Sequence, residues 1–192
     1  MSEPSGSGHV DLDGPGVSIA EVVAVARHDA SVTLTEGAIE RMSRSRQVVE
    51  RLAEGEPKYG ISTGFGALAN VSIPPERRRD LQTALVRSHA AGMGDPVENE
   101  VVRAMILLRA RTLALGSSGA RPLVAQAMID LLNAQITPMV PEYGSLGASG
   151  DLAPLAHGAL ALLGEGQVFY ADAWRPAAEA LDAAGLAPIS LV

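Results

Sequence analysis

A succession of helical segments, each bounded by its own start and stop signals, constrains the fold of this chain more than any other feature. Ser18 and Glu21 form a capping box ahead of apolar residues, which predicts a helix that runs to about His28. Thr33 and Glu36 repeat the box and predict a second helix. Its apolar face is expected at Ile39, Met42, Val49 and Leu52, and its end at Gly55.

The same signals predict five further helices downstream. Leu81, Leu85 and His89 follow at four-residue spacing, so they share one face of a helix that ends at Gly92. Asp95-Pro96 reads as an N-cap followed by proline at the first helical position. The buried stripe of that helix is expected at Val97, Val101, Met105, Leu108 and Leu115. The other helices are expected over 121–135, 151–163 (capped by Asp151) and 177–184, with a short hairpin over 167–175.

The composition agrees with a folded and mainly α-helical chain. Hydrophobic residues make up 47% of the 192 residues and charged residues 19%, which excludes a wholly disordered chain. Only 2 Phe, 3 Tyr and 1 Trp occur, so the core must be aliphatic. We expect a flexible leader over 1–16, one domain over 17–192 and at most a short β-hairpin. Two long loops, 56–75 and 139–150, are the segments expected to carry function.

Charge and residue types exclude several classes of function. The net charge of −7 argues against a nucleic-acid or anionic-membrane surface. There is no cysteine, hence no thiolate metal site, and no pair of the 4 histidines has zinc-ligand spacing, so no metal is expected. The start of the chain lacks the basic and apolar regions of a signal peptide, and no apolar run reaches the roughly 18 residues of a membrane span. A cytoplasmic location is therefore expected.

The second long loop contains a triplet that can do chemistry on itself. Ala148, Ser149 and Gly150 could form an ordinary glycine-rich turn, which is the common outcome for such a triplet alone. In a tight turn, however, the Gly150 nitrogen can attack the Ala148 carbonyl, since glycine tolerates unusual backbone angles. The former Ala148 carbonyl oxygen leaves as one water and the Ser149 hydroxyl as a second, which yields an electrophilic methylidene-imidazolone. The helix expected at Asp151 would stabilise negative charge that develops beside this group.

Two segments of the chain resemble the aromatic amino-acid ammonia-lyase family. Residues 144–166 (GSLGASGDLAPLAHGALALLGEG) are similar to the family signature, and 59–66 (YGISTGFG) to its tyrosine loop. The resemblance covers nearly all of 17–192 and is strongest to the histidine-specific members. It implies the helical N-terminal domain of an ammonia-lyase-like fold. It also implies that the triplet forms the methylidene-imidazolone without an external cofactor.

The resemblance also implies roles for residues whose ordinary interpretation is structural. Tyr59 could be a surface aromatic, but the resemblance makes it an acid–base or orienting phenol, with Gly60 beside the substrate. His89 could be a core histidine, but Ser88-His89 occupies the position that sets side-chain selectivity in the family. An imidazole substrate offers a donor and an acceptor that histidine can match. His157 is expected to support packing or a hydrogen bond rather than chemistry.

Some features depart from the family pattern. Ser62 stands where many relatives carry asparagine, and Gly158 lies inside a helix, where it would cost about 1 kcal/mol relative to alanine and soften packing. Family members are considerably longer and form homotetramers whose active sites combine subunits. We therefore expect this chain to be an N-terminal fragment that is inactive alone.

The sequence thus predicts a carbon–nitrogen lyase that deaminates L-histidine to urocanate and ammonia. Its partners are expected to be a small amino-acid substrate and further copies of itself. Two alternatives stay open. The chain could belong to a tyrosine or phenylalanine ammonia-lyase or an aminomutase, or it could be a non-catalytic helical fragment that only associates with partners.

Overall fold

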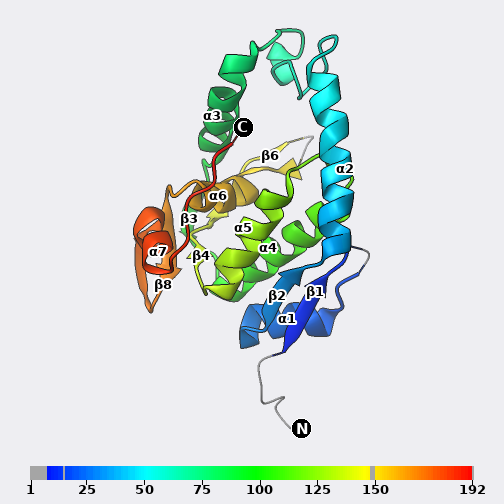
Figure 1. The fold of residues 1–192 in the computed structure, drawn as a ribbon. Coiled ribbons are helices and arrows are strands. Elements are labelled where there is room, and N and C mark those ends of the chain that lie inside the picture. The colour runs from blue at the N-terminus through cyan, green and yellow to red at the C-terminus, as the bar shows by residue number, and fades with distance from the viewer. Residues whose placement is uncertain (1–7, 15, 148–149, 192) are drawn as a thin grey trace.

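A computed structural model describes residues 8–14, 16–147 and 150–191 and confirms a mainly helical fold (Figure 1). The helices are α1 (Ile19–His28), α2 (Glu36–Ala53), α3 (Arg78–His89), α4 (Asn99–Ala114), α5 (Pro122–Asn133), α6 (Ala153–Leu162) and α7 (Ala177–Ala183). Short 3-10 helices occupy η1 (Gly66–Leu68) and η2 (Pro75–Arg77). The strands are β1 (His9–Leu12), β2 (Ser31–Leu34), β3 (Met93–Pro96), β4 (Thr137–Pro138), β5 (Pro141–Tyr143), β6 (Leu146–Gly147), β7 (Gly150–Asp151), β8 (Gln167–Tyr170) and β9 (Ala173–Pro176).

The strands form small sheets around the helices. The expected hairpin is present as β8–β9, and β4 adds to it. The expectation of at most one hairpin was wrong, because β1 pairs with β2, β3 with β5, and β6 with β7. These strands have two to four residues each, too short for a periodic pattern to be visible in the sequence.

The segment expected as a flexible leader contains a strand. β1 pairs with β2 in parallel register, and Val10 and Leu12 are buried. The leader expectation was therefore wrong for 9–12, whereas residues 1–7 and 15 lie outside the described residues. On the other side of β2, the Asn133 side chain accepts a hydrogen bond from Val32 N and donates one to Val32 O, both at 2.9 Å.

Helices α4 and α5 form the centre of the core, with α1 packed on α4. The stripe predicted for α4 was out of phase: Val101 and Leu108 are 50% and 46% exposed. The side chains that are buried on α4 are Val102, Arg103, Ile106, Leu107, Ala110, Leu113 and Ala114. Apolar residues surround most of α4, so spacing alone could not select the face that is buried.

Arg103 is the one charged residue among the buried side chains of the described segments, with 6% exposure. Its guanidinium donates to Val25 O at 2.8 Å and to Leu132 O at 3.2 Å, carbonyls in the last turns of α1 and α5. It also pairs with Asp29 at 2.8 Å. Burial lowers the pKa of Arg103, but arginine stays charged in proteins. One side chain therefore caps two helices.

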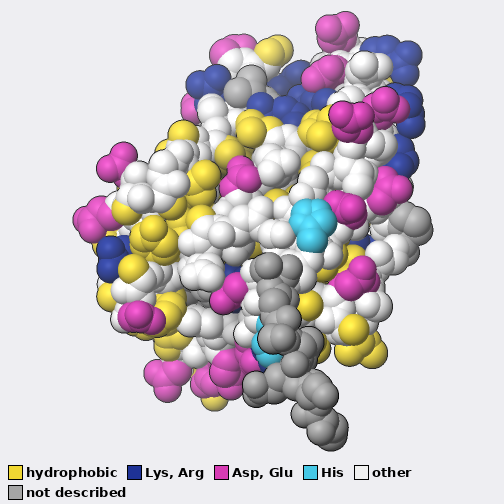
Figure 2. Space-filling model, turned by 60° about the horizontal axis from the view of Figure 1, so that its bottom comes forward, with side chains coloured by type: hydrophobic (Ala, Val, Ile, Leu, Met, Phe, Trp, Pro, Cys, Tyr) yellow, Lys and Arg dark blue, Asp and Glu magenta, His cyan; other side chains and the backbone are white. Residues whose placement is uncertain are grey.

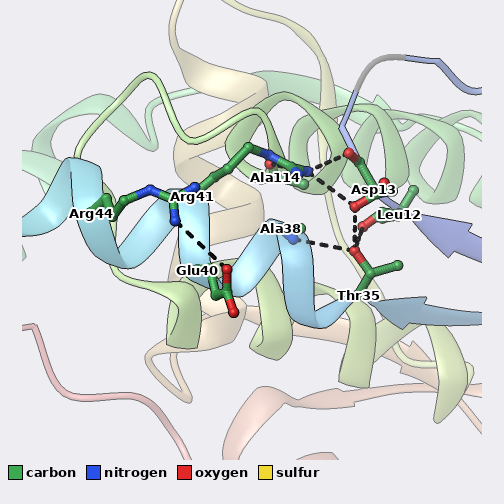
Figure 3. Close-up of polar contacts among 8 residues, drawn as sticks. All are labelled: Leu12, Asp13, Thr35, Ala38, Glu40, Arg41, Arg44 and Ala114. Carbon is green, nitrogen blue, oxygen red and sulfur yellow. Dashed lines mark hydrogen bonds and ion pairs between the residues drawn. The ribbon is translucent and has the colours of Figure 1, made fainter.

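The start of α2 is fixed by polar contacts that differ from the predicted capping box (Figure 3). Thr33 lies in β2, and the cap is Thr35, whose Oγ1 accepts from Ala38 N at 3.2 Å. Figure 3 also shows Arg41 reaching from α2 to Asp13 and to Ala114 O at the end of α4. Arg41 therefore joins α2 to the residue that follows β1 and to the end of the central helix α4.

The predicted N-cap at Asp95-Pro96 was also wrong. Met93–Pro96 forms β3 and pairs with β5, and α4 begins at Asn99 after the cap residue Glu98. An Asp-Pro pair is equally compatible with extended backbone, and the partner strand β5 lies more than 40 residues away in sequence. The local signal was therefore outweighed by a long-range pairing.

Helices α2 and α3 extend beyond the core and are joined at their far ends by the first long loop (Figure 1). No residue of α3 is fully buried. A cavity of about 730 Å³ is lined by this loop and by residues from α2, the start of α3 and 118–120. In the face drawn in Figure 2, Lys and Arg gather toward the upper end, whereas Asp and Glu are spread widely.

Candidate active site

The triplet predicted to react lies at the end of a short strand pair. Gly147 in β6 pairs with Gly150 in β7, and Ala148 and Ser149 lie outside the described residues. Gly150 has a φ of +83°, a conformation that L side chains rarely adopt, and open space where a Cβ would stand. Backbone of this kind explains why a glycine closes the triplet. The flanks that are described therefore fit the residue types that a cyclisation needs.

Asp151 holds the two ends of this loop together. Its Oδ1 accepts hydrogen bonds from Ser145 N at 3.3 Å and from Ala153 N at 3.1 Å. A Cβ on Gly144 would lie 1.9 Å from Asp151 Oδ2, so only glycine fits there. The formal cap of α6 is Leu152, yet the Asp151 carboxylate performs the capping that the sequence predicted. This helix start lies directly after the triplet.

The tyrosine loop is held by polar contacts of its own. Lys58 N donates to Ser62 Oγ at 3.0 Å, and Ser62 is buried, so the departure from asparagine leaves a side chain that fixes the turn. Tyr59 is 64% exposed and meets Phe65 edge-on, with ring centroids 5.8 Å apart. Gly60 has a φ of +71° and packs against the same ring. The phenol group of Tyr59 is therefore held at the surface by its neighbour.

Ser88 and His89 end α3 with a defined set of hydrogen bonds. His89 Nδ1 lies 2.8 Å from Leu85 O, and Ser88 Oγ donates to the same oxygen at 2.9 Å. A carbonyl oxygen only accepts, so we assign the ring proton of a neutral His89 to Nδ1. Its Nε2 is then a hydrogen-bond acceptor.

The structure brings one predicted pair of residues close to the helix that follows the triplet. α3 packs on α6, so the Ser88-His89 end of α3 lies beside this helix. Tyr59 lies in the loop that joins the far ends of α2 and α3 (Figure 1), where its ring contacts Phe65 of the same loop.

His157 makes the hydrogen bond that the sequence suggested, and its partner was not foreseen. Gly92 N donates to His157 Nε2 at 3.1 Å, so this ring is neutral with its proton on Nδ1. Burial lowers the pKa of His157 from its ordinary value of 6.5 and favours this form. The sequence marked Gly92 only as a helix end. Its real constraint is space: a Cβ there would lie 3.1 Å from His157 Nε2 and 3.2 Å from Pro141.

The lowered pKa of His157 predicts a pH dependence of stability. Between the folded pKa and the unfolded value near 6.5, the unfolded chain binds more protons. The contribution of the neutral His157 ring to the free energy of unfolding is therefore fully present above about pH 6.5. It decreases as the pH falls from there toward the folded pKa. The free energy of unfolding, measured with urea at several pH values, should fall less steeply with decreasing pH for His157→Gln than for the unsubstituted chain. The same pH dependence in both would contradict this.

The effect of Gly158 on packing differs from the expected one. A Cβ on Gly158 would lie 3.0 Å from Ile106 Cδ1, so the glycine leaves room on α6 for the Ile106 side chain of the central helix α4. The expectation of softened packing was wrong, because the missing side chain is replaced by contact with Ile106.

Within the described segments, no group of three His, Cys, Asp or Glu side chains is placed to hold a metal ion. None of the helices that are described is both long and apolar enough to cross a membrane.

Known proteins with the same fold identify the family. Residues 17–192 match the family described as Aromatic amino acid lyase. Histidine ammonia-lyase from Streptomyces griseus is 57% identical over 178 residues, which are 92% of this chain and 35% of that protein. Histidine ammonia-lyase from Trypanosoma cruzi has a TM-score of 0.86 at 34% identity, over 95% of this chain and 35% of that one.

A tyrosine aminomutase from Streptomyces globisporus is similar too, with a TM-score of 0.87 at 38% identity, over 95% of this chain and 34% of that one. The chain thus spans about a third of the length of the relatives that it matches. From the matched residues and from the fold, the chain belongs to the aromatic amino acid lyase family.

Proposed function

We propose that this chain contributes to the deamination of L-histidine to urocanate and ammonia. The observation that carries the proposal is the Ser88-His89 pair, which offers an imidazole acceptor next to the helix that follows the triplet. The 57% identity to a histidine ammonia-lyase supports it. The chain spans 35% of that relative, so we propose for it a contribution to the reaction rather than the whole reaction.

We propose that Ala148, Ser149 and Gly150 form a methylidene-imidazolone. The group would supply an electrophilic carbon that takes up the amino nitrogen and makes it a leaving group. Around it, the Asp151 carboxylate holds the loop ends, since it accepts from both Ser145 N and Ala153 N. The start of α6 presents backbone N–H groups and a positive dipole end near the same place. These features favour negative charge there and so support the proposal.

In this proposal each remaining site residue has its own task. His89 Nε2 accepts from the imidazole N–H of the substrate, while Ser88 helps to hold the ring through Leu85 O. Tyr59 acts as an acid–base or orienting phenol, with Gly60 giving the turn that presents it.

We further propose that 17–192 act as the N-terminal domain of a cytoplasmic homotetramer that functions in histidine breakdown. Support comes from exposed apolar side chains on the strands around the loop that leads to the triplet, since Met93 of β3 is 74% exposed and Leu146 of β6 is 83% exposed. Water around an electrophile favours side reactions, so these side chains would be covered in a working site.

A hybrid enzyme tests the proposed function. In it, residues 17–192 of this chain replace the matching segment of the Streptomyces griseus histidine ammonia-lyase. We expect it to convert L-histidine to urocanate, with little product from tyrosine or phenylalanine. His89→Leu should lower kcat/KM for histidine about 100-fold, because the imidazole N–H loses its acceptor, and His89→Gln should lower it less. A hybrid that deaminates histidine equally well with His89→Leu would contradict the role of His89.

The aminomutase similarity keeps a second candidate function open. The tyrosine aminomutase is 38% identical to this chain over the same fold. A hybrid that converts tyrosine or phenylalanine to the β-amino acid, with no urocanate from histidine, would favour that function. The intact mass of the 192-residue chain separates both from a non-catalytic fragment. Loss of two water molecules within Ala148–Gly150 indicates the cyclised group, and an unmodified mass favours the fragment.

A further inference from the structure

Two polar contacts between α3 and the α6 region flank the predicted substrate-recognition pair. One residue before Ser88, the Arg87 guanidinium donates to both carboxylate oxygens of Glu165, at 2.8 and 2.6 Å. Three residues after His89, Gly92 N donates to His157 Nε2 at 3.1 Å. Ser88 and His89 are therefore held between two contacts to the helix that follows the triplet or to the turn beyond it.

The two contacts differ in how firmly they fix geometry. The Arg87 side chain is 59% exposed, and an exposed ion pair is weakened by water and salt. The His157 contact joins a backbone N–H to a partly buried ring with one available acceptor. A contact to backbone also fixes the chain itself, rather than the tip of a long side chain.

Gly92 lies where three elements meet. A Cβ on it would lie 3.1 Å from His157 Nε2 and 3.2 Å from Pro141 of β5, so Gly92 itself lies close against both, whereas the strand β3 that follows it is exposed. The next residue, Met93, pairs with Tyr143 at the other end of β5. Any shift of Gly92 would therefore move the end of α3 relative to the strands that lead into the triplet loop.

From this arrangement we propose that His157 is a positioning residue for the imidazole of the substrate. It acts through Gly92: the ring acceptor on α6 fixes the backbone after His89 and so sets where His89 Nε2 stands relative to the triplet. This inference rests on the proposed histidine deamination. In this proposal His157 itself does not touch the substrate.

The test uses two substitutions of His157 in the hybrid enzyme. His157→Leu removes the acceptor, and we expect KM for L-histidine to rise about tenfold with kcat changed by less than about threefold. His157→Gln keeps an acceptor oxygen at similar reach and should restore KM to within about twofold. Arg87→Gln, which removes the exposed contact, and His28→Gln, at the exposed end of α1, should each change KM by less than about twofold.

Several outcomes decide between positioning and mere packing. A normal KM in His157→Leu overturns the inference, and so does a Gln variant as impaired as the Leu variant. Loss of the two-water mass deficit in His157→Leu, together with loss of turnover, would show that His157 serves formation of the triplet group rather than recognition and would overturn the inference. If the unsubstituted hybrid fails to deaminate histidine, the proposed function is wrong and the inference falls with it. In the 192-residue chain, faster amide exchange of Gly92 in His157→Leu than in His157→Gln would show directly that the contact is broken.

Discussion

Ser149→Ala in the hybrid enzyme is expected to abolish urocanate formation, by a factor on the order of 1,000 or more, as when an enzyme loses its covalent centre. Alanine has no hydroxyl to lose, so the exocyclic methylidene cannot form. The intact mass should then no longer show the loss of two water molecules. Mass spectrometry of the peptide that contains 144–153, together with the absorbance change of urocanate, measures both effects.

Ser145→Ala is the matched control for this substitution. Ser145 lies in the same loop, and its recorded contact with Asp151 is made by the backbone N–H, which alanine keeps. We expect this variant to cyclise and to turn over histidine within about twofold of the unsubstituted hybrid. A Ser149→Ala hybrid that keeps both the mass deficit and the activity would show that the electrophile arises elsewhere.

Arg103→Ala is expected to cost about 3 kcal/mol of the free energy of unfolding of this chain. The substitution leaves the Val25 and Leu132 carbonyls without their donor and Asp29 without its counter-charge. Since Asp29 is half exposed, water compensates part of that loss, which places the effect at the lower end for a broken buried pair. Urea unfolding at neutral pH measures the change, provided that the free energy of unfolding depends on urea concentration equally in the variant and in the unsubstituted chain.

Arg27→Gln provides the comparison on the surface. Arg27 also makes two contacts with a carboxylate, that of Glu100, at 2.6 and 2.9 Å, but both side chains are exposed. Its replacement should therefore shift the urea midpoint far less than Arg103→Ala does. Similar shifts for the two variants would mean that Arg103 does not owe its effect to burial and to the two helix ends.

The sequence was sufficient for helices that carry complete local signals. The Ser18 box is present with both of its reciprocal bonds, α5 begins at Pro122, and α7 ends before Gly185. Each of these signals acts within about four residues, so it needs no knowledge of the rest of the fold. The same holds for the β8–β9 hairpin, whose strands are consecutive.

The features that could not be predicted from the sequence depend on partners that are distant along the chain. The Thr33 box failed because Thr33 joins a strand whose partner is His9–Leu12, and Asp95-Pro96 failed because β3 pairs with β5. The role of Gly92 likewise depends on His157, which lies 65 residues away. In the candidate site, the family resemblance implied the reacting and recognising residues. It did not reveal that Gly92 N donates to His157, because a glycine that only contributes an N–H and an empty volume has no sequence signature.

The Asn133 amide beside β2 has a consequence for how this chain meets other chains. Because Val32 already exchanges both of its backbone hydrogen bonds with Asn133, that edge of the two-stranded sheet has no free pair to offer at its centre. An incoming strand would have to displace a side chain anchored on the central α5. A single side-chain amide thus blocks edge-to-edge aggregation at this strand. Larger sheets prevent such aggregation with charges, prolines or bulges.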